Sequence, residues 1–171
     1  MAALKDRRFW WLALGALLGV AVGGLWPPTP IHAVATDRLD NFAMATGHLD
    51  DETEAVYFLD FLTGELKASA LSPVVRKFFA GFRANVMADL KIDAARNPKF
   101  MLVTGDSIFR HNGGQIQPGN AVVYVAEMTS GKVAAYAVPW SHAYSTSGRP
   151  INAPMVLLDV MQFRVPQVPG P

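Results

Sequence analysis

The sequence predicts a mainly β (α+β) protein, in which an N-terminal transmembrane helix precedes a duplicated antiparallel β-meander domain with one intervening amphipathic helix. Three observations lead to this fold class. An uncharged apolar run lies near the N-terminus, two later stretches resemble each other, and an apolar stripe of helical period lies between them. The 171 residues are 51% hydrophobic, which fits one domain plus an apolar segment.

The apolar run covers residues 9–26 and contains no charged residue. A helix of this length spans roughly 27 Å, which is just enough for a hydrocarbon core of ~30 Å. Basic residues precede it, so the positive-inside rule places residues 1–8 in the cytoplasm and sends the rest across the membrane. The residues expected at the two membrane interfaces are Trp10, Trp11 and Trp26.

A cleaved export signal is the alternative to a retained anchor. The small-x-small stretch Ala33-Val34-Ala35 would allow cleavage after Ala35. Against this, the apolar run is longer than the usual ~7–15 residues of a signal h-region. A twin-arginine signal at Arg7-Arg8 is a third alternative, although the residues that follow agree poorly with that motif.

Glycines recur every four residues within the apolar run, at Gly15, Gly19 and Gly23. Residues at this spacing lie on one helix face, where the backbone of another helix can approach closely. Glycine is also common in membrane spans in general, which would explain the pattern without a partner. The predicted partners are therefore membrane lipid and, through this glycine face, a second copy or another membrane-protein subunit.

The exported domain is predicted over 36–165, between a Pro-containing linker at 27–35 and a tail at 166–171. Within it, residues 42–71 resemble residues 100–138 and indicate an internal duplication. The matching positions are Thr46-Gly47 with Thr104-Gly105, Val56-Tyr57 with Val123-Tyr124, Asp60 with Glu127, and Gly64 with Gly131. Strand-forming residues and Gly-containing turns predict a three-stranded antiparallel meander for each copy. One further strand is predicted over Met155–Val165.

An amphipathic helix is predicted over 73–90, between the two copies. Its apolar stripe is Val75, Phe79, Phe82, Val86 and Leu90, at spacings of three and four. Ser72 could cap it, with Pro73 at the first helical position. The stripe fits a helix that covers the sheets, and the alternative is a helix lying on a membrane surface.

Two segments are candidates for contacting a ligand or partner. The long connection at 106–120 carries Arg110 and His111, and long loops often carry function. The segment 139–150 carries Trp140, His142 and Tyr144, residue types that suit recognition of a sugar or a protein. The alternatives are an ordinary hairpin loop and a turn in which Trp140 caps the core. The acidic segment 47–55 fits a solvated loop better than a calcium site.

Several classes of chemistry are excluded or unsupported. The chain has no cysteine, which excludes disulfides, thiol nucleophiles and zinc–thiolate sites. A net charge of +1 predicts no attraction to nucleic acid. No catalytic signature is present and the four histidines lack metal-ligand spacing, so no catalytic residue, metal or cofactor is predicted.

Two stretches carry a resemblance to known families. The hairpin AVYFLDFLTGEL at 55–66 resembles a blade segment of PQQ- or WD-type propellers, and the similarity extends only over the two repeats. A propeller needs about four to eight four-stranded blades, so one chain with two incomplete copies cannot form a complete one. The stretch WPPTPIHAVATDRLDNFAMATG at 26–47 is similar to single-span membrane proteins of planctomycete-type bacteria, a resemblance that implies no activity.

These features favour a non-catalytic, membrane-anchored structural, scaffold or accessory subunit of a bacterial membrane or envelope assembly. Its expected location is the bacterial inner membrane, with a cytoplasmic N-terminus and a periplasmic domain. The first alternative is an extracytoplasmic binding module for a sugar or another envelope component. The second is an exported enzyme with a site built from loops.

Overall fold

The computed structural model describes residues 10–19, 36–38, 40–93, 95, 97–109, 116–147 and 149–164. The chain divides into two compact units, Met1–Ala33 and Val34–Pro171. In the first unit, residues 10–19 are helical. Across the described part of the chain, no helix combines the length and the apolar character that a membrane crossing requires. The predicted transmembrane segment extends past this helix at both ends, and Gly23 and Trp26 lie outside the described residues.

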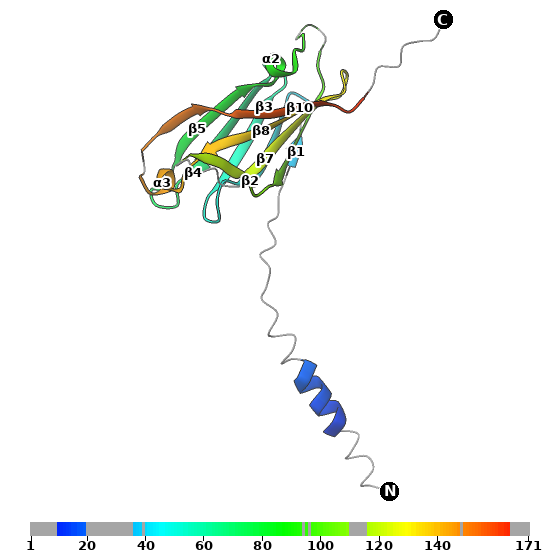
Figure 1. Ribbon diagram of the computed structural model, residues 1–171, viewed down its shortest axis with the longest axis vertical. Helices are drawn as coiled ribbons and strands as arrows, with labels where there is room; N and C mark the ends of the chain where they lie inside the picture. Colours follow the sequence, from blue (N-terminus) through cyan, green and yellow to red (C-terminus); the bar gives the residue numbers. More distant parts are fainter. Residues whose placement is uncertain are drawn as a thin grey trace, which may run out of the picture. The chain divides into compact units, whose positions relative to one another are not determined.

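In its described residues, the second unit is mainly β, with two sheets and two short α-helices (Figure 1). The six-stranded sheet has the order β1 (Thr36–Arg38), β2 (Phe42–His48), β3 (Glu54–Asp60), β4 (Glu65–Leu71), β5 (Phe78–Asn85) and β9 (Ile151–Pro154). The four-stranded sheet has the order β10 (Val156–Gln162), β8 (Lys132–Trp140), β7 (Gln117–Glu127) and β6 (Phe100–Asp106). The helices are α2 (Val86–Leu90) and α3 (His142–Ser147), and they lie at opposite ends of the two sheets.

Both predicted repeats form three antiparallel strands, β2-β3-β4 and β6-β7-β8. The two turns that join their last strands share one geometry. Gly64 and Gly131 have φ angles of 68° and 72°, a region that glycine adopts without a Cβ clash. Each glycine N–H donates to the carbonyl of the matching acidic residue, Asp60 or Glu127, at 2.9 Å. The meanders predicted from the sequence are therefore present, with matching turns.

The predicted helix over 73–90 is wrong for most of its length. Residues 78–85 form strand β5, which pairs with β4 on one side and β9 on the other, and only α2 is helical. A β-bulge at Phe79 explains the misleading stripe, because it turns Phe79 to the same side as Phe82, so that two residues three apart are both buried. The alternative of a helix lying on a membrane surface is wrong for the same reason.

The predicted cap at Ser72 has a smaller role than expected. Its hydroxyl accepts the N–H groups of Val74 and Val75 at 3.3 and 3.2 Å, as an N-cap would. The turn then ends at Arg76, whose φ is 56°. Ser72 N–H instead donates to the Lys77 carbonyl at 2.9 Å, which closes a hairpin between β4 and β5.

The two sheets enclose one hydrophobic core between their inner faces. The six-stranded sheet contributes Tyr57, Leu59, Leu66 and Phe82, and the four-stranded sheet contributes Phe100, Leu102, Val123, Val125 and Tyr136, each at most 2% exposed. Burial of one such large side chain stabilises the fold by roughly 1.5–3 kcal/mol. Val86 and Leu90 of α2 are also buried and belong to the same cluster.

Direct contacts join the two sheets on both sides of the core. On one side, the Thr104 hydroxyl of β6 donates to the Thr46 carbonyl of β2 at 2.6 Å. On the other side, the chain passes from β9 in one sheet to β10 in the other through the buried Met155, whose N–H donates to the Arg83 carbonyl at 2.8 Å. The predicted strand over Met155–Val165 corresponds to β10, whereas β1 and β9 were not predicted.

The matching glycines of the two repeats give a test of this packing. A Cβ on Gly47 would lie 2.8 Å from the Ala121 Cβ and 3.3 Å from the Tyr57 ring, whereas a Cβ on Gly105 would meet only the Tyr124 ring at 3.5 Å. We expect Gly47→Ala to destabilise the protein by about 1–3 kcal/mol in chemical denaturation, because the core has no space for the methyl group. Gly105→Ala is the matched control and should change stability by no more than ~0.5 kcal/mol. Equal effects of the two variants would contradict this account.

The turn at Glu127 makes a second prediction. Its carboxylate accepts the N–H groups of Lys99, Thr129 and Ser130 at 3.2, 2.9 and 2.6 Å. Burial raises the pKa of Glu127, but these hydrogen bonds outweigh burial and bring the pKa from 4.5 to about 2.

A pKa that is lower in the folded state gives stability that is complete above the unfolded value and is lost as the pH falls through the folded value. We therefore expect the free energy of unfolding to decline between pH 4.5 and about 2. Denaturation series over this range should show a shallower decline for Glu127→Gln. An unchanged slope in Glu127→Gln would show that the carboxylate does not supply this stability.

Candidate functional site

Two of the residues predicted to contact a ligand, Trp140 and His142, meet Asp50 at one end of the second unit. Asp50 lies in the turn between β2 and β3, and Trp140 and His142 lie at the end of β8 and the start of α3. The Trp140 indole N–H donates to Asp50 Oδ2 at 2.7 Å, and His142 Nδ1 lies 3.4 Å from the same oxygen. Burial raises the pKa of the Asp50 carboxyl, but the hydrogen bonds, led by that from Trp140, outweigh burial and hold the pKa below its ordinary value.

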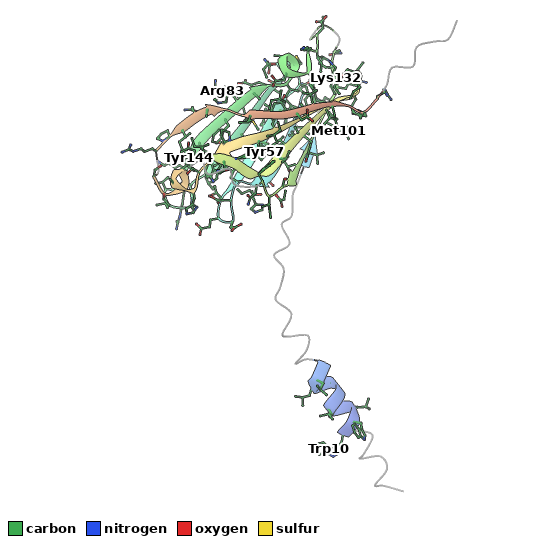
Figure 2. The ribbon with its side chains drawn as sticks, in the orientation of Figure 1. Trp10, Tyr57, Arg83, Met101, Lys132 and Tyr144 are labelled. Atoms are coloured by element: carbon green, nitrogen blue, oxygen red, sulfur yellow. The ribbon has the colours of Figure 1, made fainter. Side chains whose placement is uncertain are left out.

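The Trp140 ring is part of the core. It is 4% exposed and makes edge contacts with the rings of Phe79, Phe82 and Tyr144 at centroid distances of 6.1, 6.4 and 5.7 Å. Its faces are therefore occupied by neighbouring side chains and do not offer a stacking platform to a sugar. Of the two interpretations from the sequence, the geometry fits a Trp140 that caps the core. The Tyr144 ring lies beside it. Figure 2 shows Tyr144 at the α3 end.

A cavity of about 360 Å³ lies against Asp50. Its lining comes from the β2–β3 turn, the β6–β7 connection, the start of β7 and the junction of β8 with α3: Leu49, Asp50, Ile108, Phe109, Gln117, Pro118, Asn120, Trp140, Ser141 and His142. The volume is within the range of small-molecule sites, and the Asp50 carboxylate and the exposed His142 imidazole supply polar groups. Arg110 and His111, which the sequence predicted to contribute, lie outside the described residues.

Asp50 was missed as a site residue by sequence reasoning. It belongs to the acidic segment 47–55, which reads as a solvated loop, and its partner Trp140 is 90 positions away in the chain. Only the packing of the β2–β3 turn against the end of β8 brings them together. Among the residues that the structure describes, no group of three or more His, Asp or Glu side chains is arranged to hold a metal ion.

A second cavity, of about 560 Å³, lies beside β5 and α2, where the chain passes from β9 to β10. Its lining residues are Thr63, Glu65, Arg83, Ala84, Asn85, Asp89, Pro154, Met155 and Leu157. At its inner side, the Tyr136 hydroxyl donates to the Asp89 carboxylate at 2.9 Å. Burial, followed by this hydrogen bond, raises the pKa of Tyr136, so the phenol stays protonated and fixes the position of Asp89.

The four-stranded sheet has an outer face without any basic residue. Strand register and alternation place twelve side-chain positions on it: Met101, Val103 and Gly105 of β6, Val122, Tyr124 and Ala126 of β7, Val133, Ala135 and Ala137 of β8, and Val156, Asp159 and Met161 of β10. We call this set the apolar face. Asp159 is its only charged member. Large side chains such as Met101 (45%) and Met161 (57%) are exposed on it, whereas Val122 and Ala137 of the middle strands are buried.

The outer face of the six-stranded sheet has a different composition. It carries charges on three neighbouring strands: Glu54, Asp60, Glu65, Lys67 and Arg83. Lys67 and Glu65 form an ion pair at 3.0 Å. Phe42 and Phe58 stack on each other within this face at 5.0 Å between ring centroids. Charged side chains thus solvate one outer face of the unit, while the apolar face presents mainly hydrocarbon.

The predicted helix-packing and interface residues lie in the first unit. Trp10 and Trp11 are 75% and 67% exposed, and a Cβ built on Gly15 or Gly19 would meet no atom within 4 Å. This part of the helix therefore has space for a partner along its glycines. Gly23, the third glycine of the face, lies outside the described residues.

No protein-family model matches the chain, and no curated protein or solved structure matches it significantly. A functional interpretation therefore depends on three features of the second unit: the Asp50 cavity, the Asp89 cavity and the apolar face.

The Asp50–Trp140 hydrogen bond gives a test of how the first cavity is held. Asp50→Ala leaves the indole N–H of a nearly buried Trp140 without its acceptor, so we expect a loss of about 1–3 kcal/mol in chemical denaturation. Asp51→Ala is the matched control, because Asp51 is exposed beside it, and it should cost no more than ~0.5 kcal/mol. Equal losses in the two variants would show that the acceptor contributes nothing specific.

Proposed function

We propose that the protein is a non-catalytic, membrane-anchored structural or accessory subunit of a bacterial membrane or envelope assembly. Its folded domain binds another protein through the apolar face, and its N-terminal segment holds that domain at the inner membrane, on the periplasmic side. The proposal also holds that the chain is related to the single-span membrane proteins of planctomycete-type bacteria, which residues 26–47 resemble.

The apolar face is the observation that carries this proposal. Monomeric soluble proteins rarely leave a large contiguous apolar patch exposed, and such patches mark interaction sites. Tyr124 and Val103, at the centre and one side of the face, are 42% and 49% exposed. Exposed hydrocarbon that a partner covers contributes roughly 25 cal/mol per Å² to the free energy of binding. Covering the charged outer face of the other sheet would not give a comparable free energy of binding.

The sequence of residues 9–26 supports the proposed membrane anchor. The run is uncharged, follows basic residues and carries tryptophans near both ends, as a single membrane span does. Gly15, Gly19 and Gly23 would then offer a second contact, between helices, to a further copy or to another subunit. Membrane lipid is the remaining partner that this proposal requires.

A ligand-binding module for a sugar or envelope component is the second candidate. The Asp50 cavity supports it, because a carboxylate and an imidazole, 3.4 Å apart, lie at the edge of a space of about 360 Å³. The proposed recognition would depend on Asp50 and His142 and not on the Trp140 ring, which is enclosed in the core.

Two methionines give a matched test of the leading proposal. Met101 on the apolar face and Met44 on the other outer face are each 45% exposed. We expect the full-length protein, extracted from native membranes in mild detergent, to migrate as a complex larger than a monomer. Met101→Glu should release it as a monomer, because a partner would bury the new charge, whereas Met44→Glu should leave the complex intact.

Denaturation curves and circular dichroism on both variants show whether the fold is retained. A monomer in native extracts of the unmodified protein would overturn the proposal. Equal loss of the complex in folded Met44→Glu and Met101→Glu would also contradict it, because the effect would then not belong to the apolar face.

A further inference from the structure

We propose that the partner bound by the apolar face is a second copy of this chain, packed sheet against sheet about a two-fold axis that runs parallel to the strands. This inference rests on the proposed function, since it names the partner of the same face. It concerns a surface on the strands and is independent of the glycines of the N-terminal helix.

The register of the four strands arranges the apolar face in three rows. From β6 to β10 these rows are Met101-Ala126-Val133-Met161, Val103-Tyr124-Ala135-Asp159 and Gly105-Val122-Ala137-Val156. Large flexible side chains lie at the outer strands of the first row, and small ones lie in the middle strands. Tyr124 is the one large side chain in the middle of the face, next to Ala135.

A two-fold axis parallel to the strands exchanges β7 with β8 and β6 with β10 of the facing copy. Tyr124 of one copy then lies over Ala135 of the other, and the same contact repeats by symmetry. In the first row, Val133 lies over Ala126, and Met101 lies over Met161. Large side chains of the middle strands therefore meet small ones, which is the interdigitation that packed sheets require.

A two-fold axis perpendicular to the strands gives a worse fit. It would place Tyr124 over Tyr124 in the middle of the face and Asp159 over Asp159 at its edge. The first contact brings two bulky rings together where the sheets need to approach, and the second opposes two like charges. With the parallel axis, Asp159 lies at the rim over Val103 and keeps its contact with water.

Pairing through the exposed edge of β10 is a less favourable way to join two copies. All seven residues of β10 are exposed, and it is the last strand of its sheet. However, the strand has a bulge between Leu157 and Asp159, and Asp159 is charged. Bulges and charges on an edge strand are features that oppose pairing with another strand. The face is therefore the better docking surface.

The apolar face is small for a dimer interface, which favours dimer formation at a membrane over dimer formation in solution. Four strands ~4.8 Å apart, over the five residues per strand that the three rows span, have a plan area of roughly 330 Å². Specific interfaces begin at roughly 600 Å² per partner, so protruding side chains such as Tyr124 and Met101 have to supply the remainder. An interface near this lower limit gains from confinement of both copies to one membrane, which raises their effective concentration.

Cross-linking distinguishes this arrangement, because the native chain has no cysteine. Met101 and Met161 lie on opposite edges of one sheet, roughly 14 Å apart, but face each other across the proposed interface. We would mix full-length Met101→Cys and Met161→Cys chains with different tags, reconstitute them into phospholipid vesicles and add a short bifunctional maleimide. A disulfide is too short for this purpose, because facing sheets stand ~10 Å apart.

The expected result is a cross-linked dimer that carries both tags, whereas Met101→Cys alone and the Met44→Cys control give little product. Adding Ala135→Glu to both chains should lower the cross-linked fraction by roughly tenfold or more, a change equivalent to about 1.4 kcal/mol. Unfolding curves of the Ala135→Glu chains confirm that the monomer still folds.

Two results would overturn the inference. Cross-linking of Met101→Cys to Met161→Cys at the level of the Met44→Cys control would show that copies do not pack about the proposed axis. Stronger cross-linking of Met101→Cys to Gly105→Cys would show the other two-fold axis. If native extracts still contain a complex that Met101→Glu dissociates, the proposed function remains and the partner is a different protein. If the extracts contain no complex, both proposals fail.

Discussion

The packing of two sheets against one another around a shared core is the constraint on which the folded unit depends. A hairpin alone is marginal in water, because its apolar face has nothing to be buried against. Here Tyr57 and Phe82 of one sheet and Tyr136 of the other are each at most 2% exposed in the same cluster. Because Gly47 has no side chain, β2 can lie against Ala121 and Thr104 of the other sheet.

This packing also determines where function can lie. The inner faces are committed to the core, and the tryptophan at the end of β8 is drawn into it, so the Trp140 ring is unavailable to a ligand. What remains are the two ends of the unit, where connections leave cavities beside Asp50 and Asp89, and the two outer faces. The contrast between a charged and an apolar outer face therefore carries more functional information than any single side chain.

Sequence reasoning succeeded where the determinants are local. The turns at Gly64 and Gly131 depend on residues within a few positions of each other, and the strands beside them are rich in strand-forming residues, so both meanders were predictable. The segment 73–90 failed because a bulge gave a strand the burial pattern of a helix. Whether Phe79 and Phe82 belong to a helix or a strand depends on the presence of β4 and β9 beside them, which periodicity cannot show.

The sequence by itself determined the β-rich class, the two meanders with their glycine turns, and the lack of cysteine chemistry, because composition and short-range turn geometry decide these. Only the tertiary structure decided the partition into two sheets, the passage of the chain from β9 to β10, the Asp50–Trp140 contact and the apolar face. These depend on contacts such as that between residues 50 and 140, whose free energy comes from packing between distant segments and leaves no local pattern in the chain.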